Sequence, residues 1–257
     1  ENSVFRSNKA TGEDRFSGTG GVLKPVSTSS QLYNLSIVDS EFYNNSASLK
    51  GGCIDWSVMP YLQNNHFSNN SAQYGADLAS FGVKLVPKTA RNLIHYEAAP
   101  GQVAPFVIIL EIVDHYGNLV TTDNETSAEM IPMNKSTFLS KNQIVKAQKG
   151  VMRFDSFIIN GEPGSLQPLK IRSSSLEVLL EVSLRDCDVG EMRKEKECWI
   201  CEKGKYSLNP GEPCKKCPDE AECYGGYSVF PKKGYWRPSE FTDKFFKCPN
   251  EEACLGG

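Results

Sequence analysis

The chain has 257 residues, with 28 basic side chains, 31 acidic side chains and three histidines, and this length has room for two or three domains. Because the charge is nearly balanced and no third of the chain is strongly basic, the composition argues against nucleic acid or an anionic lipid surface as a partner. The sequence has no initiator methionine, no signal peptide and no apolar run long enough to cross a bilayer, so we expect a piece of a longer protein.

Residues 1–85, called here the repeat region, contain three copies of one short pattern. FRSNKA begins at Phe5, FYNNSA at Phe42 and FSNNSA at Phe67, and two small residues come after each copy: Gly20-Gly21, Gly51-Gly52 and Gly75-Ala76. A repeated unit of about 20–40 residues is typical of a solenoid, and frequent Asn, Ser and Gly disfavour a helical one. We predict parallel β-helix coils, with stacked phenylalanines inside, asparagines and glycines at the corners, and one alternating strand over residues 35–42.

This repeated sequence motif resembles the polymorphic outer membrane protein repeat, known from bacterial autotransporter-like proteins and from large surface proteins of ciliates. The resemblance covers about residues 1–80 and implies a pectin-lyase-like β-helix. Because three coils are barely enough for a stable solenoid, we expect more coils upstream. The third copy has GAD where the pattern has two glycines, which fits a terminal coil.

Two alternatives for the repeat region stay open. One is an irregular segment rich in Asn and Ser. The other is a carbohydrate-active enzyme on a β-helix, in which Asp39, Asp55 and Asp77 occupy matched coil positions and share one face. We expect no catalysis, because no Arg or Lys recurs beside these carboxylates and the sequence indicates no cleft around them.

Residues 86–186, called here the central region, have the sequence pattern of an all-β sandwich. The predicted elements are a strand at 105–114, a turn at 115–118 with the strand resuming at 119–123, a strand at 151–160, a turn at 161–164 and an alternating strand at 176–186. About 100 residues of such strands favour an immunoglobulin-like fold. The phrase GQ…PFxIxLxxxDxYGN is similar to filamin-type and bacterial Ig-like repeats, which act as spacers or adhesive units. Asp114, Asn118 and Asp123 are candidate calcium ligands, although we prefer to interpret them as turn residues.

Residues 187–257, the cysteine-rich region, hold eight of the nine cysteines: Cys187, Cys198, Cys201, Cys214, Cys217, Cys223, Cys248 and Cys254. The spacing from Cys198 to Cys217 is acceptable for a zinc ribbon. We prefer a disulfide framework, because the number of cysteines is even and a short segment with few aliphatic residues needs staples. Spacing does not fix the pairing. Sequential loops, Cys187–Cys198, Cys201–Cys214, Cys217–Cys223 and Cys248–Cys254, are our choice, and a crossed pairing of the two CxxC units is the alternative.

The segment CWICEKGKYSLNPGEPCKKCPDEAEC resembles EGF-like, tumour-necrosis-factor-receptor-like and ephrin-receptor-like modules. The next segment, YGG…PKKGYWRPSEF…FKCPNEEACLGG, is similar to the segments that lead to transmembrane helices in very large ciliate membrane proteins, which implies a membrane-proximal stalk whose anchor lies outside this chain. Eight aromatic residues are predicted to wrap the disulfides as a small core, with a contact patch for a neighbouring subunit as the alternative: Tyr224, Tyr227, Phe230, Tyr235, Trp236, Phe241, Phe245 and Phe246.

The remaining candidate sites are glycosylation sequons and one odd cysteine. The sequons are at Asn34, Asn44, Asn69, Asn124 and Asn134, and beside so many cysteines they favour the secretory pathway. Cys53 is expected to be a buried free thiol, with an intermolecular disulfide as the alternative. The histidines, His66, His95 and His115, stand alone, and no catalytic or nucleotide-binding motif is present, so we expect no enzyme, metal or cofactor.

These observations predict a structural or adhesive segment of a large extracellular or cell-surface glycoprotein, with the ciliary surface as one candidate location. Its expected partners are copies of itself or other surface proteins, together with N-linked glycans and no nucleic acid. The alternatives are a ligand-sensing ectodomain of a receptor or channel, and a carbohydrate-active enzyme on the β-helix.

Overall fold

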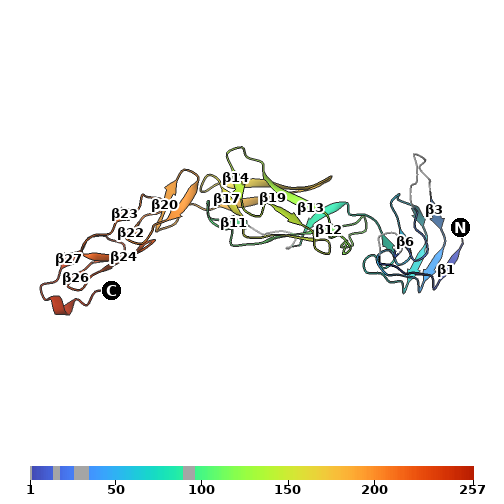
Figure 1. The fold of residues 1–257 in the computed structure, drawn as a ribbon, viewed down its shortest axis with the longest axis horizontal. Helices are drawn as coiled ribbons and strands as arrows, with labels where there is room; N and C mark the ends of the chain where they lie inside the picture. Colours follow the sequence, from blue (N-terminus) through green and yellow to red (C-terminus); the bar gives the residue numbers. More distant parts are fainter. Residues whose placement is uncertain (1, 14–17, 26–34, 89–95) are drawn as a thin grey trace.

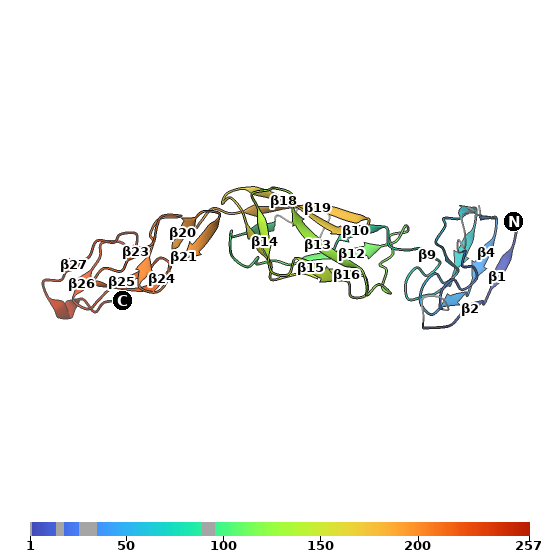
Figure 2. The same ribbon diagram turned by 45° about the horizontal axis from the view of Figure 1, so that its top comes forward.

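The computed structural model describes residues 2–13, 18–25, 35–88 and 96–257, and these residues are essentially all-β (Figure 1). The three regions succeed one another along the long axis of the molecule, from the N-terminus at one end to the cysteine-rich region at the other (Figures 1 and 2). The described residues contain one short 3₁₀ helix, η1 (Glu251–Ala253). Among them, no helix has the length and apolar character to cross a membrane.

Short parallel strands build the repeat region. They are β1 (Val4–Arg6), β2 (Lys9–Ala10), β3 (Ser36–Val38), β4 (Glu41–Tyr43), β5 (Ser46–Ala47), β6 (Ile54–Asp55), β7 (Tyr61–Gln63), β8 (His66–Ser68) and β9 (Leu78–Ala79). Strand β4 lies between β1 and β8, while β2 pairs with β5, β3 with β7 and β6 with β9, always in parallel. Each copy of the repeat therefore lies against the next copy in the same orientation.

The register places equivalent residues of the repeats on top of one another. Phe42 pairs with Phe5 on one side and with Phe67 on the other, and the ring centroids are 4.7 and 4.9 Å apart. Phe42 is fully buried, in a cluster with Ile37, Cys53, Ile54 and Trp56. Stacked rings at the strand spacing fill the narrow interior, which these short strands alone would leave without a core.

The two adjacent asparagines of the repeat have different tasks. The first, Asn44 or Asn69, adopts a left-handed backbone with φ of 56° and 54°, which asparagine tolerates better than most residues. The second forms a ladder, in which the Asn45 side-chain oxygen accepts from the Asn8 amide group and Asn45 in turn donates to Asn70, at 3.0 and 3.1 Å. One asparagine turns the chain and the next satisfies buried polar groups.

The two positions of each glycine pair also require a small residue for different reasons. Gly20, Gly51 and Gly75 have φ between 62° and 65°, a conformation that favours glycine. A Cβ atom on Gly52 would overlap the carbonyl oxygen of Ala76 in the next repeat. Ala76 itself is exposed, and no further repeat lies on it among the described residues, which explains why alanine is accepted there.

The single strand expected over residues 35–42 was a wrong prediction. The chain forms β3, turns at Asp39 with a left-handed φ of 51°, and continues as β4. Asn64 adopts the same conformation in the next repeat, where Asp39 donates its backbone amide to Gln63. The alternating pattern of polar and apolar residues over 35–42 therefore gave no sign of the corner at Asp39.

The central region contains two larger sheets and a strand pair. Strands β10 (Lys84–Pro87), β12 (Ile108–Val113) and β16 (Val151–Phe154) form one sheet in the order β10-β12-β16. Strands β11 (Tyr96–Ala98), β13 (Ser127–Pro132), β15 (Ile144–Lys146), β18 (Leu166–Ser173) and β19 (Leu176–Leu184) form the other, in the order β11-β19-β18-β13-β15. Strand β14 (Phe138–Ser140) pairs with β17 (Ile158–Asn160). All these pairs are antiparallel except β11 with β19.

One hydrophobic core is shared by the two sheets. Leu110, Met152, Met130, Ile171 and Val182 come from different strands and are all buried in the same cluster. The alternation expected over 176–186 is present in β19, although Leu179 on the outer face is exposed. The predicted strand at 151–160 is instead interrupted at Ser156, whose φ is 55°, and residues 119–123 form no strand.

Small antiparallel pairs make up the cysteine-rich region. They are β20 (Glu191–Lys194) with β21 (Glu197–Ile200), β22 (Lys205–Tyr206) with β23 (Lys215–Lys216), β24 (Ala221–Gly225) with β25 (Ser228–Pro231), and β26 (Tyr235–Trp236) with β27 (Phe246–Lys247). Disulfides join Cys187 to Cys198, Cys201 to Cys214, Cys217 to Cys223 and Cys248 to Cys254, which is the sequential arrangement.

The aromatic core expected in the cysteine-rich region is not formed. Six of the eight aromatic residues are exposed, from 37% for Phe230 to 80% for Phe241: Tyr224, Tyr227, Phe230, Trp236, Phe241 and Phe246. The small core here consists of Tyr206, Ala221, Cys223 and Val229. Because cross-links already hold the short strands together, the large rings are left at the surface.

Candidate functional site

The junction between the repeat region and the central region is organised by Asp114. This carboxylate is 3% exposed, and it comes directly after β12. One oxygen accepts from the backbone amides of Tyr116 and Asn118, and the other accepts from the backbone amide of Ser80 and the side-chain amide of Asn118. Four donors therefore satisfy the carboxylate, and one of them, Ser80, comes from the preceding region.

The calcium alternative for Asp114, Asn118 and Asp123 does not match these bonds. The nitrogen of the Asn118 side chain points at Asp114 and at the carbonyl of Leu78, at 3.2 Å each. Asp123 accepts instead from the backbone and hydroxyl of Thr126. Donors surround both carboxylates where a calcium ion would need free oxygen ligands, so both act as turn and junction residues.

Aromatic side chains complete the same junction. Trp56, at the end of the second repeat, is buried, and its indole nitrogen donates to the Tyr116 hydroxyl at 2.8 Å. His115 lies beside the Trp56 ring with centroids 4.9 Å apart, and Phe81 meets both rings edge-on. His115 is thus a packing residue. His66 is an exposed residue of β8, and His95 lies outside the described residues.

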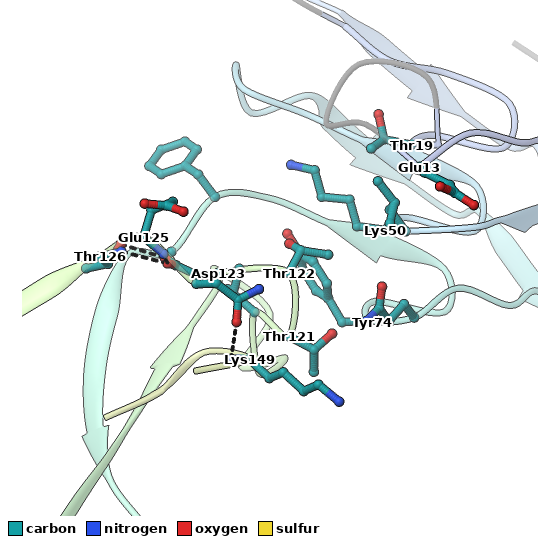
Figure 3. Close-up of a pocket in the computed structure, with 16 residues that line it drawn as sticks. Glu13, Thr19, Lys50, Tyr74, Thr121, Thr122, Asp123, Glu125, Thr126 and Lys149 are labelled. Carbon is teal, nitrogen blue, oxygen red and sulfur yellow. Dashed lines mark hydrogen bonds between the residues drawn. The ribbon is translucent and has the colours of Figure 1, made fainter. Parts of the chain in front are cut away.

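A polar cleft opens beside this junction, with a volume of about 570 Å³ (Figure 3). The repeat region contributes Lys50, Gln73 and Tyr74 to its walls, and the central region contributes residues 120–126 and Lys149. Tyr74 donates its hydroxyl to the carbonyl of Ser80 at 2.9 Å, and burial together with nearby Asp55 raises the pKa of this phenol. The volume lies in the range typical of small-molecule sites.

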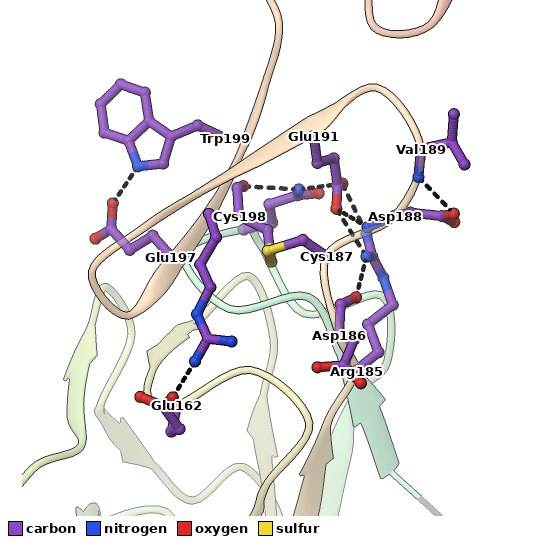
Figure 4. The surroundings of a disulfide bond; sticks show 12 residues. Glu162, Arg185, Asp186, Cys187, Asp188, Val189, Glu191, Glu197, Cys198 and Trp199 are labelled. Carbon is purple, nitrogen blue, oxygen red and sulfur yellow. Dashed lines mark hydrogen bonds and ion pairs between the residues drawn. A yellow bond between two sulfur atoms is a disulfide. The ribbon is translucent and has the colours of Figure 1, made fainter. Parts of the chain in front are cut away.

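The junction between the central and cysteine-rich regions is organised by Glu191 (Figure 4). Arg185 donates to both carboxylate oxygens of Glu191 at 2.8 Å, in a bidentate pair. Gln102 and the backbone amide of Asp188 donate to the same carboxylate. Chiefly because of the Arg185 bond, the pKa of Glu191 is lowered to about 2, although burial opposes this shift.

Two further contacts support this second junction. Cys198 donates its backbone amide to the carbonyl of Pro100, and Arg193 forms an ion pair with Glu162. Cys187, Cys198 and Glu191 are close enough to suggest a metal site. Both sulfurs are used in a disulfide and Arg185 occupies the carboxylate, so no thiolate is left to hold an ion. The zinc-ribbon cysteines are likewise divided among three disulfides.

The described sequons lie at the surface. Asn44, Asn69, Asn124 and Asn134 are all exposed, while Asn34 lies outside the described residues. Asn44 and Asn69 occupy equivalent corners of neighbouring repeats, since Asn44 donates its backbone amide to Ser68. Asn124 lines the polar cleft, and Asn134 is in the turn after β13.

Cys53 is a free cysteine inside the repeat region, with no solvent exposure. Burial raises the pKa of its thiol to about 12, and the nearby Asp77 carboxylate raises it as well. A thiol in this state is a small apolar residue that fills space beside Phe42 and Ile54.

The three candidate carboxylates of the enzyme alternative are not at matched positions. Asp77 precedes β9 and aligns with Cys53, since Ile54 pairs with Leu78 and Asp55 with Ala79. Asp55 is buried and forms an ion pair with Lys50 at 2.9 Å. Asp77 accepts from Asn70, and Asp39 forms the corner between β3 and β4. Each therefore serves its own local structure.

Sequence reasoning missed the residues that join the regions, namely Trp56, Tyr74, Gln102, Arg185 and Glu191. Several of their partners lie in distant segments, up to 96 residues away for Gln102, and no local pattern marks such pairs. The one usable signal was the DxYGN phrase, which we interpreted as a turn but not as a junction.

Neither a known family profile nor a curated protein sequence matches this chain. Solved structures that it is similar to include domains 4 and 5 of the S-layer protein SbsC, at 15% identity and a TM-score of 0.29, covering 42% of this chain and 55% of that one. Domains 4–9 of SbsC match at 17% identity with a TM-score of 0.29, covering 44% of this chain and 16% of that one. Domains 1–6 match at 14% identity with a TM-score of 0.27, covering 65% of this chain and 26% of that one. The chain spans about half or less of each.

Proposed function

We propose that this chain is a structural or adhesive segment of a large extracellular protein, and that its three regions act as one stiff rod. The observation that carries the proposal is the pair of junctions, each centred on a buried carboxylate that receives donors from both sides. Without such partners, neighbouring domains are expected to move relative to one another. A spacer or stalk needs this stiffness, whereas an isolated binding module does not.

The finer architecture is part of the same proposal. Parallel pairing and stacked phenylalanines support parallel β-helix coils of the polymorphic outer membrane protein type in the repeat region. Two sheets around one core support an Ig-like or filamin-like sandwich in the central region. Short hairpins linked by sequential disulfides support an EGF-like or receptor-like module.

The expected location also belongs to the proposal. Four disulfides and four exposed sequons among the described residues favour an oxidising, glycosylating compartment, and so an extracellular or cell-surface protein. A membrane anchor would lie outside this segment, and copies of the chain or other surface proteins are its proposed partners. The ciliary surface is one candidate location.

We propose no enzymatic activity for this segment. Asp39, Asp55 and Asp77 support this proposal, because each has a separate structural task, whereas glycoside chemistry uses a pair of carboxylates that face one substrate. Incubation with pectin and related polymers tests this point, and turnover that disappears in Asp55→Asn would contradict it.

Small-angle X-ray scattering on the intact chain tests the rod. We expect one extended shape for the wild type and a broader distribution of lengths for Asp114→Ala, which removes the acceptor of Ser80, Tyr116 and Asn118. Asp155→Ala is the matched control, because this carboxylate is 45% exposed and its ion pair with the nearby Arg153 lies within the central region. If the wild type already samples many bent shapes, the chain is a flexible tether and the proposal is wrong.

The cleft favours one second candidate, a ligand-sensing ectodomain. A sensor should be stabilised by a discrete ligand in proportion to its concentration, while a rod should associate only with copies of itself or other surface proteins.

A further inference from the structure

Among the described sequons, Asn124 alone lines the polar cleft at the first junction. Its side-chain oxygen accepts the backbone amide of Lys149 at 2.8 Å, which fixes the amide plane and leaves the nitrogen available. The loop that carries it is held by Asp123, which accepts from Glu125 and Thr126. A group attached to Asn124 would therefore start from a rigid base on the wall of the cleft.

The cleft walls suit a neutral polyhydroxyl chain. Their ionic side chains nearly balance, with Glu13, Asp123 and Glu125 against Lys50 and Lys149. Two of the five are already paired, Lys50 with Asp55 and Glu125 with Lys146. A strongly charged ligand would thus find no excess of opposite charge.

Hydrogen-bonding and stacking groups remain on both walls. Thr19 and Thr121 bury hydroxyl oxygens that have no hydrogen-bond partner among the described residues, and rotation about χ1 can turn them toward a polar occupant. Phe81 also lines the cleft, is 50% exposed and offers an aromatic ring on which the apolar face of a sugar can stack.

We propose that the N-linked glycan of Asn124 lies in this cleft and bridges the repeat region to the central region. The inference rests on the proposed passage through the secretory pathway. In the covalent step, the Asn124 side-chain nitrogen attacks C1 of a sugar in a lipid-pyrophosphate-linked oligosaccharide donor. The N–C1 bond forms, the lipid pyrophosphate leaves with the bonding electron pair, and the nitrogen loses one proton. The first sugars then fill space beside Lys149 and reach the opposite wall at Gln73 and Lys50.

The test uses the intact chain from a eukaryotic secretory host, with Asn124→Asp and Asn134→Asp as matched variants. Both substitutions destroy a sequon but keep the acceptor oxygen that Lys149 or Ser136 requires. Glycopeptide mass spectrometry measures occupancy, peptide N-glycosidase measures release from the native protein, and hydrogen exchange reports on residues 71–75 across the cleft.

We expect native release at Asn124 to be slower than at Asn134 by about tenfold or more, because cleavage must wait for the cleft to open. After denaturation the two rates should agree. Asn124→Asp should increase exchange at 71–75, and Asn134→Asp should leave it unchanged. Equal native release with no change in exchange would place the glycan in solvent and overturn the inference, as would an unmodified Asn124 beside an occupied Asn134. The absence of glycan from every sequon would count against the proposed surface location as well.

Discussion

The repeat region and the cysteine-rich region are both built from strands of two to five residues, yet different forces hold them together. In the repeat region, identical residues stack in register, so that three phenylalanines and a ladder of asparagines form the interior. In the cysteine-rich region, four disulfides cross-link the chain, and the buried core among the described residues has only four members. Repetition supplies a core where the chain can align with itself, and covalent bonds replace the core where it cannot.

The comparison also explains where aromatic side chains lie. Phe42 is fully buried between two equivalent rings, whereas Phe241 is 80% exposed. The stack needs a ring at each level to exclude water. The cross-linked region needs none, because disulfides limit its unfolded state whether or not rings are buried.

The largest expected effect comes from breaking the stack. Phe42→Ala should lower the free energy of unfolding of the repeat region by about 3–5 kcal/mol, since it opens a cavity between Phe5 and Phe67. Urea unfolding monitored by hydrogen exchange measures the change. Phe67→Ala, at a half-buried position, should cost clearly less. Equal losses would mean that the rings do not act as a stack.

Removing one disulfide bond should give the next largest effect. Replacing Cys201 and Cys214 together by serine should destabilise the cysteine-rich region by about 3 kcal/mol, through the freedom regained by the unfolded loop. Proteolysis should then cut this region first and leave the repeat region intact. If mild reduction destabilised the repeat region equally, the contrast between the two regions would be false.

The second junction should respond to acid. Because the pKa of Glu191 in the folded protein, about 2, lies below its ordinary value, the stabilisation is complete above the ordinary value and is lost as pH falls towards 2. Glu191→Gln should cost about 2 kcal/mol at neutral pH, the contribution expected of hydrogen bonds to a charged group. Hydrogen exchange in β20 and β21 monitors the junction.

The Glu191→Gln variant serves as its own control for the titration. Its junction should lose most of the dependence on pH below the ordinary glutamate range, because the group that takes up the proton is gone. A variant that kept the wild-type acid profile would assign the titration to another carboxylate.

Substitutions of the two adjacent asparagines of the repeat should differ in their effect on stability. Asn45→Ala should cost about 1–3 kcal/mol, because it removes the acceptor of the Asn8 backbone amide and the side-chain donor to the Phe5 carbonyl and the Asn70 amide oxygen. Asn44→Gly should be close to neutral, since glycine accepts the left-handed conformation at this corner. Thermal unfolding of the two variants compares them directly, and a cost at Asn44 equal to that at Asn45 would contradict the division of tasks.

The smallest effect concerns the free cysteine. Because burial raises the pKa of Cys53 to about 12, it should resist alkylation in the native protein at a mildly alkaline pH of about 8 and react once the repeat region unfolds. Mass spectrometry of the labelled peptide measures both states. Rapid native labelling, or a dimer that reducing agent dissociates, would favour the intermolecular disulfide instead.

Much of the fold was predictable wherever the pattern is local. The repeated FxNNSA words predicted stacking, and the alternation in 176–184 predicted β19. The same reasoning missed the corner at Asp39 and the interruption at Ser156, because a single left-handed residue leaves the polar and apolar pattern unchanged. The same reasoning predicted a buried aromatic core in the cysteine-rich region, where the structure leaves most of these rings exposed. Composition does not say how much core a cross-linked region needs.

The sequence by itself determined the composition of each region: which residues repeat, where the cysteines cluster and which asparagines lie in sequons. Tertiary structure alone decided that Asp114 and Glu191 become junction residues, because one donor to each, Ser80 to Asp114 and Gln102 to Glu191, comes from a segment distant in the chain. It also decided that Asn124, unlike Asn134, lines a cleft. These properties depend on how separate regions meet, and a local sequence pattern cannot encode a contact whose two sides are specified in different parts of the chain.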